Sequence, residues 1–289
     1  MRPITSLGLI ANLTRPRARE GVEALICAAK AAGIRLLPSP ETAEALGAAP
    51  GVAPEAFAQA GAQGVISLGG DGSFLAAAHA VAATELPLIG LNIGRLGYLT
   101  AVNEEGFGPL LQALAQGRYA VEARTALAAG IAGTSRFPDA LNDVVVSRSE
   151  SGHAIALLLE LDGFPVARYL CDGLILATPT GSTAYSLSVG GPVVSPAAKA
   201  LVISVIAPHA LSARPLVIPD GTRVVVRVEE AEGAQARIYA DGVAVASLAP
   251  GAALEASASP RPVRLLLPED HNPYAPLALK LGWGGPFRR

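Results

Sequence analysis

The stretch Val65-Ile66-Ser67-Leu68-Gly69-Gly70-Asp71-Gly72-Ser73-Phe74-Leu75-Ala76-Ala77-Ala78 decides the fold of the first half of this chain. Its apolar start predicts a buried strand, and the alanine-rich run after the glycines predicts a helix. The glycines between them let the backbone turn sharply, and a helix start presents free N–H groups. This order is typical of a phosphate-binding turn at the carboxyl end of a parallel strand.

One carboxylate, Asp71, stands among these glycines, where a small substrate can reach it. An aspartate in such a turn can orient a hydroxyl nucleophile, accept its proton or help to hold Mg²⁺. The alternative is an aspartate that only caps the following helix. The strand before Asp71 and the helix after it favour the functional interpretation.

Strand and helix signals alternate on both sides of this stretch. Strands are predicted at 7–10, 34–37, 65–68 and 88–91, and helices at about 16–32, 73–83 and 104–116. Such alternation predicts a Rossmann-like parallel sheet covered by helices. We therefore assign residues 1–118 to an N-terminal α/β domain.

The second half of the chain changes to short β-rich runs. They lie at 143–147, 155–161, 174–177, 201–206, 223–228 and 238–240, and the pairs Asp162-Gly163 and Asp241-Gly242 predict hairpin turns. Residues 119–260 are thus expected to form a mainly β, sandwich-like domain. A last strand is predicted at 263–267, in a tail (261–289) whose packing partner the sequence leaves open.

A second candidate site follows the strand at 174–177. The turn Thr178-Pro179-Thr180-Gly181-Ser182-Thr183-Ala184-Tyr185-Ser186 crowds hydroxyl groups around one glycine, more than a helix cap requires. Tyr185 offers a flat ring suited to stacking on a nucleotide. Asn142-Asp143 offers an amide and a carboxylate that suit ribose or adenine, although an Asx turn before a strand is the simpler interpretation.

Composition and missing motifs exclude several classes of protein. The chain has 289 residues, 51% of them hydrophobic, and a net charge of −2, which predicts real cores and no strong attraction to nucleic acid or membranes. P-loop, dinucleotide-fold and hydrolase-elbow motifs are missing, and the four histidines lack metal-ligand spacing. Cys27 and Cys171 are expected to be buried core residues. No secretory or membrane-spanning segment is apparent, so a cytoplasmic protein is expected.

Further motifs occur in a fixed order along the chain and carry a family resemblance. After Gly69-Gly70-Asp71-Gly72 come Leu91-Asn92-Ile93-Gly94-Arg95-Leu96-Gly97-Tyr98-Leu99, Asn142-Asp143, Asp172-Gly173, Thr178 to Ser188 with Gly190-Gly191-Pro192, and Pro208-His209-Ala210-Leu211-Ser212-Ala213-Arg214-Pro215-Leu216. With these motifs the chain resembles the NAD kinases, which phosphorylate the 2′-hydroxyl of the adenosine ribose of NAD to give NADP.

This resemblance implies an N-terminal α/β domain, a C-terminal β domain, NAD bound between them, and a homo-oligomer, either dimer or tetramer. By the family pattern Asp71 corresponds to the proton acceptor. The positions that correspond to NAD contacts are Gly72, Asn142, Asp143, His153, Asp172, Thr183, Ala184, Tyr185, Ser186, Leu187, Ser188 and Ala207. Mg²⁺ is the expected cofactor, and ATP or inorganic polyphosphate the phosphate donor.

The chain departs from the family pattern at a few positions. Leu170 stands where many bacterial members have a basic residue, with Arg168 as the alternative cation, and Val243 stands where glutamine is common. Two other functions remain open at this point. A lipid kinase with the same glycine-rich loop would need an apolar acceptor pocket, and a non-enzymatic nucleotide-binding regulator would have no use for a carboxylate beside phosphates.

Overall fold

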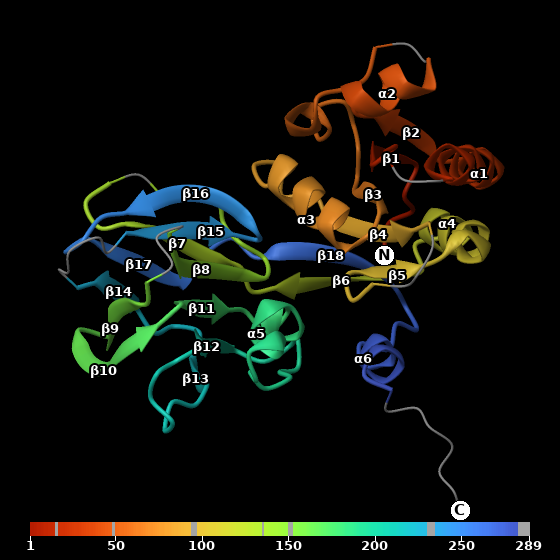
Figure 1. Cartoon of the computed structure of the whole chain (residues 1–289). Helices are drawn as coiled ribbons and strands as arrows, with labels where there is room; N and C mark the ends of the chain where they lie inside the picture. Colours follow the sequence, from red (N-terminus) through yellow and green to blue (C-terminus); the bar gives the residue numbers. More distant parts are fainter. Residues whose placement is uncertain are drawn as a thin grey trace, which may run out of the picture. The chain divides into compact units, whose positions relative to one another are not determined.

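The computed structural model describes residues 1–14, 17–47, 50–93, 97–134, 136–149, 153–229 and 235–282. Two compact units make up the chain (Figure 1): Met1–Ala123 with Val263–Arg289, and Arg124–Pro262. The chain thus leaves the first unit five residues after the boundary expected at residue 118. The tail, whose packing partner the sequence left open, returns to the first unit.

The first unit is built on one sheet with the strand order β2-β1-β3-β4-β18-β6, in which β5 also pairs with β4. β1 is parallel to β2 and β3, and β4 is parallel to β3, β5 and β18. The strands are β1 (Ser6–Ala11), β2 (Arg35–Pro38), β3 (Val65–Gly69), β4 (Leu88–Asn92), β5 (Thr100–Val102), β6 (Tyr119–Arg124) and β18 (Val263–Pro268). Because β2 and β3 lie on opposite sides of β1, the winding reverses between β1 and β3, where ligands of such sheets bind.

Helices cover both faces of this sheet. They are α1 (Ala18–Ala31), α2 (Pro40–Leu46), α3 (Asp71–Ala80), α4 (Phe107–Ala115) and α6 (Ala275–Lys280), with 3₁₀ turns η1 (Pro54–Ala56) and η2 (Glu104–Gly106). Apolar side chains of α1 and α4 share one core with β1, β3 and β4. Phe74 of α3 is buried on the opposite face, since its ring lies against the β-carbon position of Gly90, whereas the neighbouring Ile89 and Leu91 point into the core with α1 and α4. No helix in the described ranges is long and apolar enough to cross a membrane.

Helix α1 differs from its prediction at its start and at Cys27. Pro16, the predicted helix start, lies outside the described residues, and the helix begins at Ala18. The prediction that Cys27 is buried is wrong, because its thiol is exposed. The buried face of α1 contains Ala18, Gly21, Val22, Leu25 and Ala29, and position 27 falls on the other side of a 3.6-residue period.

The second unit consists of two mainly antiparallel sheets with the strand orders β10-β9-β14-β17-β7 and β13-β12-β11-β8-β15-β16. Its elements are β7 (Leu127–Ile131), β8 (Asp143–Arg148), β9 (Ile155–Leu161), β10 (Phe164–Cys171), β11 (Gly173–Ala177), η3 (Gly181–Thr183), α5 (Tyr185–Ser188), β12 (Ala200–Ile206), β13 (Leu216–Pro219), β14 (Val224–Val228), β15 (Ala236–Ala240), β16 (Val243–Leu248) and β17 (Ala253–Ala258). Both predicted Asp-Gly hairpins are confirmed, since Asp162, Gly163, Asp241 and Gly242 all have positive φ.

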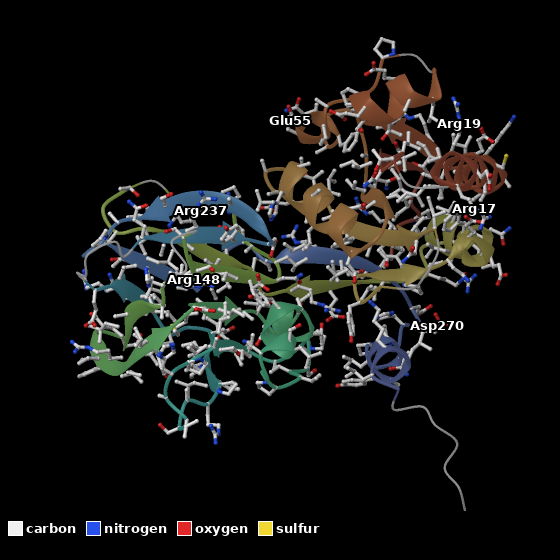
Figure 2. All side chains as sticks on the ribbon, viewed as in Figure 1. Arg17, Arg19, Glu55, Arg148, Arg237 and Asp270 are labelled. Carbon is white, nitrogen blue, oxygen red and sulfur yellow. The ribbon has the colours of Figure 1, made fainter. Side chains whose placement is uncertain are left out.

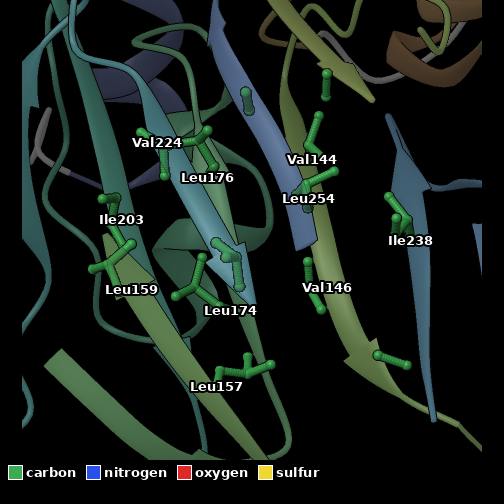
Figure 3. Packing of buried hydrophobic residues seen from close by; sticks show 14 of the residues in the cluster. Val144, Val146, Leu157, Leu159, Leu174, Leu176, Ile203, Val224, Ile238 and Leu254 are labelled. Carbon is green, nitrogen blue, oxygen red and sulfur yellow. The ribbon is translucent and has the colours of Figure 1, made fainter. Parts of the chain in front are cut away.

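Alternating apolar side chains from both sheets meet in the core of the second unit (Figure 3), as in a sandwich. Leu157 and Leu159 of one sheet and Leu174 and Leu176 of the other belong to this cluster. Cys171 is also part of it, and burial raises the pKa of its thiol to about 11. The predicted fold class, a Rossmann-like parallel α/β unit plus a β-sandwich-like unit, is confirmed.

Candidate active site

In the first unit, Asp71 is the first residue of α3, directly after the turn that ends β3. Its carboxylate is held by the segment 97–100. Oδ2 accepts a hydrogen bond from the Tyr98 backbone N–H at 2.9 Å, and Oδ1 accepts one from the Leu99 N–H at 3.0 Å. The Thr100 hydroxyl also donates to Oδ1, at 3.3 Å. We call these three donors the carboxylate clamp.

The clamp is itself fixed by the end of β4 and by a glycine. The Thr100 hydroxyl, fully buried, accepts hydrogen bonds from the Asn92 side-chain amide and from the Gly97 N–H, both at 3.0 Å. A β-carbon at Gly97 would overlap Asp71 Oδ1, so only glycine lets the backbone come this close. The neighbouring motif residues Gly94, Arg95 and Leu96 lie outside the described residues.

The clamp leaves part of the carboxylate available. An ionised carboxylate offers about four acceptor positions on its two oxygens. Two donors occupy Oδ1 and one occupies Oδ2, so Oδ2 retains room for one further donor, such as a substrate hydroxyl. Asp71 is about a third exposed, at 31%, which keeps this position accessible.

Two side chains lie beside this carboxylate. The Lys280 Nζ atom of α6 is 3.7 Å from Asp71 Oδ2 and 4.2 Å from the centroid of the Tyr98 ring. Burial and, to a smaller extent, the charge of Asp71 raise the pKa of the Tyr98 phenol, so its ring is a neutral face for the ammonium group. No signal in the sequence connects Lys280 with Asp71, because the two residues are about two hundred positions apart.

The start of α3 is open toward a ligand. A β-carbon placed at Gly72 would meet no atom within 4 Å, so the backbone there is not covered by the protein. Ser73 is held at the switch point, because the Asn12 amide at the end of β1 donates to its hydroxyl at 3.4 Å. Free N–H groups in the first turn of a helix attract anions.

In the second unit, Asp241 organises the Asn142-Asp143 segment. Its carboxylate accepts three backbone hydrogen bonds, from the N–H groups of Leu141 at 2.8 Å, Asn142 at 2.7 Å and Asp143 at 3.2 Å. The Asn142 side chain is hydrogen-bonded to no other described residue and remains available. The sequence identified Asp241 only as a turn residue, because its partners are about a hundred positions away.

Asp143 is a buried carboxyl group, 5% exposed. Burial first, and the charge of Asp241 second, raise its pKa from 3.8 to about 7, while a hydrogen bond from the Tyr185 backbone N–H acts in the opposite direction. This bond joins the start of β8 to the start of α5. The structure therefore brings Asn142, Asp143 and Tyr185 together, as the sequence grouped them.

Most hydroxyls of the turn at 178–186 bind the protein itself. Thr178 donates to the Leu141 carbonyl at 2.6 Å, and Ser182 donates to the Pro179 carbonyl at 2.6 Å. Ser186 shares a hydrogen bond with Ser204 at 2.9 Å. The Thr180 Oγ1 atom, by contrast, is buried without a partner in the described structure. The predicted contact residues Ala184, Leu187 and Ser188 lie in the same turn and in helix α5. Tyr185 is 45% exposed.

Asp172 has a cation that the sequence analysis missed. The Arg148 Nε atom, at the end of β8 and labelled in Figure 2, lies 2.9 Å from Asp172 Oδ1. Arg168, the alternative cation considered from the sequence, instead pairs with Glu229 at 2.7 Å.

Two predicted NAD contacts remain. His153 is exposed and lies just before β9, and Ala207 follows β12 with a positive φ of 44°. The His153 side chain forms no hydrogen bond with the described residues.

Comparison with known proteins assigns both units to one family. Residues 7–119 match the model of the ATP-NAD kinase N-terminal domain, and residues 141–267 match that of the ATP-NAD kinase C-terminal domain. An NAD kinase of Moorella thermoacetica is 37% identical over 286 residues, covering 96% of this chain and 90% of the relative. This chain belongs to the NAD kinase family. An NAD kinase of Ralstonia nicotianae is 42% identical over 221 residues, 75% of this chain and 72% of the relative.

Solved structures share the fold. Yeast NADH kinase, solved in complex with NADH, superposes with a TM-score of 0.83 at 23% identity and covers 99% of this chain and 90% of its own. An NAD kinase from Archaeoglobus fulgidus, solved with ATP, gives a TM-score of 0.74 at 24% identity, covering 97% and 99%. The family assignment identifies the chain as a kinase enzyme and removes the lipid kinase and regulator alternatives.

Proposed function

We propose that this NAD kinase transfers the γ-phosphoryl group of ATP to the 2′-hydroxyl of the adenosine ribose of NAD, giving NADP and ADP, with Asp71 as the proton acceptor. The observation that carries the assignment of Asp71 is its clamp. Three protein donors fix the carboxylate and leave one acceptor position on Oδ2. A base held in one orientation needs no rearrangement when the substrate hydroxyl arrives.

The reaction balances around that position. The 2′-oxygen bonds to the γ-phosphorus, the bond from the γ-phosphorus to the bridging oxygen breaks, and ADP leaves. Asp71 Oδ2 receives the proton of the 2′-hydroxyl. The free N–H groups at the start of α3 and the uncovered backbone at Gly72 suit the negative charge of the donor phosphates.

The second unit supplies the proposed NAD contacts. Asn142 offers an amide free for the ligand, and the exposed Tyr185 ring offers a stacking surface. Asp172 and the turn Thr183–Ser188 complete this set, together with His153 and Ala207. We add Thr180, since its buried hydroxyl lacks a partner among the described residues, and such groups are normally satisfied by a ligand or water.

A divalent metal ion, Mg²⁺, fits this arrangement if it enters the site bound to the phosphates of the donor. The described residues contain no group of three or more potential metal-binding side chains, and Mg²⁺ commonly binds through substrate phosphates and one or two carboxylates. The donor phosphates themselves would hold the ion, because the free acceptor position of Asp71 Oδ2 is assigned to the substrate hydroxyl, and the ion would neutralise phosphate charge. Homo-oligomerisation and a cytoplasmic location stay predictions.

The test is a single assay of the purified protein. NAD or NADH is combined with Mg²⁺ and either ATP or inorganic polyphosphate, and NADP or NADPH is measured with an NADP-specific dehydrogenase. We expect formation of NADP from NAD and ATP that stops when EDTA removes the metal. A diacylglycerol arm serves as the negative control. Absence of NADP with every donor would overturn the proposal.

A further inference from the structure

Lys280, in the C-terminal helix α6, places a positive charge beside the glycine-rich turn that contains Asp71. Its Nζ atom lies 3.7 Å from Asp71 Oδ2. This separation is too long for a charged hydrogen bond, which is normally 2.7–2.9 Å. The ammonium group donates no hydrogen bond to any described residue, so its three N–H groups remain available for a ligand.

The position of α6 does not depend on this charge. Pro276 and Leu277 are buried and anchor the helix, whereas the Lys280 side chain is 32% exposed. A partly exposed ion pair without a hydrogen bond contributes little to stability. The Tyr98 ring supports the ammonium at 4.2 Å from its centroid and defines where the charge sits. The protein therefore fixes the position of the Lys280 ammonium group but leaves its hydrogen-bond donors available.

The oxygen that Lys280 approaches is the one with a free acceptor position. Oδ1 is occupied by Leu99 and Thr100, while Oδ2 has one donor and faces the lysine. A hydroxyl bound at Oδ2 receives its phosphoryl group within reach of the same ammonium. Besides Mg²⁺, Lys280 adds a cation from the protein itself, which offsets the repulsion between the negative charge of Asp71 and the donor phosphates.

We infer that Lys280 binds the γ-phosphoryl group of the donor and neutralises its charge during transfer at Asp71. This inference rests on the proposed function, because it assigns a donor contact within the same site. A lysine is suited to this task as a compact point charge on a flexible chain. When ATP is bound, the ammonium keeps its contact with Oδ2 and adds hydrogen bonds to γ-phosphate oxygens.

The test compares Lys280→Met with Lys280→Arg and with Lys30→Met, a control at the exposed last turn of α1. Binding of ATP and of ADP, each with Mg²⁺, is measured by calorimetry, and kcat and the KM values for NAD and ATP are measured separately. We expect Lys280→Met to lower kcat by about 100-fold and ATP affinity by about 10-fold. ADP affinity and the KM for NAD should stay within about twofold, because neither ligand carries the transferred group.

Lys280→Arg should recover at least about a tenth of the wild-type kcat, since it restores the charge. Equal losses of ATP and ADP affinity, or a Lys280→Met variant with kcat within about twofold of wild type, would overturn the inference. Thermal unfolding of all variants distinguishes a loss of activity caused by the missing charge from one caused by unfolding of α6. If the wild-type protein forms no NADP, the proposed function itself fails. If the wild-type protein forms NADP and the Lys280 variants form it equally fast, the proposed function holds and the role of Lys280 fails.

Discussion

The buried carboxyl of Asp143 allows the most quantitative prediction. Burial, followed by the charge of Asp241, raises its pKa from 3.8 to about 7. Between these two values the folded protein keeps a proton that the unfolded chain has released. The free energy of unfolding therefore falls as the pH rises, by about 1.4 kcal/mol per pH unit, and the penalty is complete above about pH 7.

Asp143→Asn isolates this effect, because asparagine does not titrate and keeps an oxygen for the Tyr185 N–H. From about pH 5 to about pH 8, two of the three pH units lie in the interval in which only the folded state holds the proton. We expect the free energy of unfolding of wild type, relative to the variant, to fall by about 3 kcal/mol over this range.

The assay is urea unfolding followed by far-UV circular dichroism at both pH values. Asp220→Asn is the matched control, since the Asp220 side chain hydrogen-bonds no described residue and its substitution should give no such change. The reasoning is refuted if the difference between wild type and Asp143→Asn changes by less than about 0.5 kcal/mol between the two pH values.

Three further variants test how the sites are positioned. Gly97→Ala places a methyl group against Asp71 Oδ1, so kcat should fall at least about 10-fold, while Gly108→Ala, in open space on α4, should leave kcat unchanged. Asp241→Ala leaves three backbone donors without their acceptor and should lower the free energy of unfolding by about 2–4 kcal/mol and weaken NAD binding, measured by denaturation and calorimetry. Gly181→Ala overlaps the Asn142 carbonyl and should raise the KM for NAD, whereas an unchanged KM would contradict the proposed role of Asn142.

The fold was largely predictable because its strongest signals are local. The strand, glycines and helix around Asp71 lie within sixteen consecutive residues, from Val65 to Ala80, and each Asp-Gly hairpin is a two-residue signal. Strands β5, β6, β7, β13 and β17 were not predicted. Of these, β7 and β17, with the sequences LAAGI and ALEASA, consist mostly of small residues without a clear alternation. The burial of Cys27 was mispredicted for a related reason, because the many alanines of α1 obscure its apolar face.

The site was only partly predictable, because its geometry depends on residues that are distant in sequence. Asp71 could be identified from its own neighbours, but its clamp comes from residues 97–100 and its neighbouring cation from α6. The hydroxyl-rich turn was a similar case. The sequence indicated ligand groups there, yet Thr178 and Ser182 bind backbone carbonyls, and such pairings depend on which strands lie side by side.

The most direct test of the proposed role of Asp71 is the rate of NADP formation by Asp71→Asn at saturating NAD and ATP. If the carboxylate accepts the proton, the rate should fall by about 100-fold or more, while the affinity for NAD stays within about threefold. Thr100→Val, which removes one clamp hydrogen bond and keeps the carboxylate, should lose much less. An Asp71→Asn variant that turns over at the wild-type rate would contradict the account.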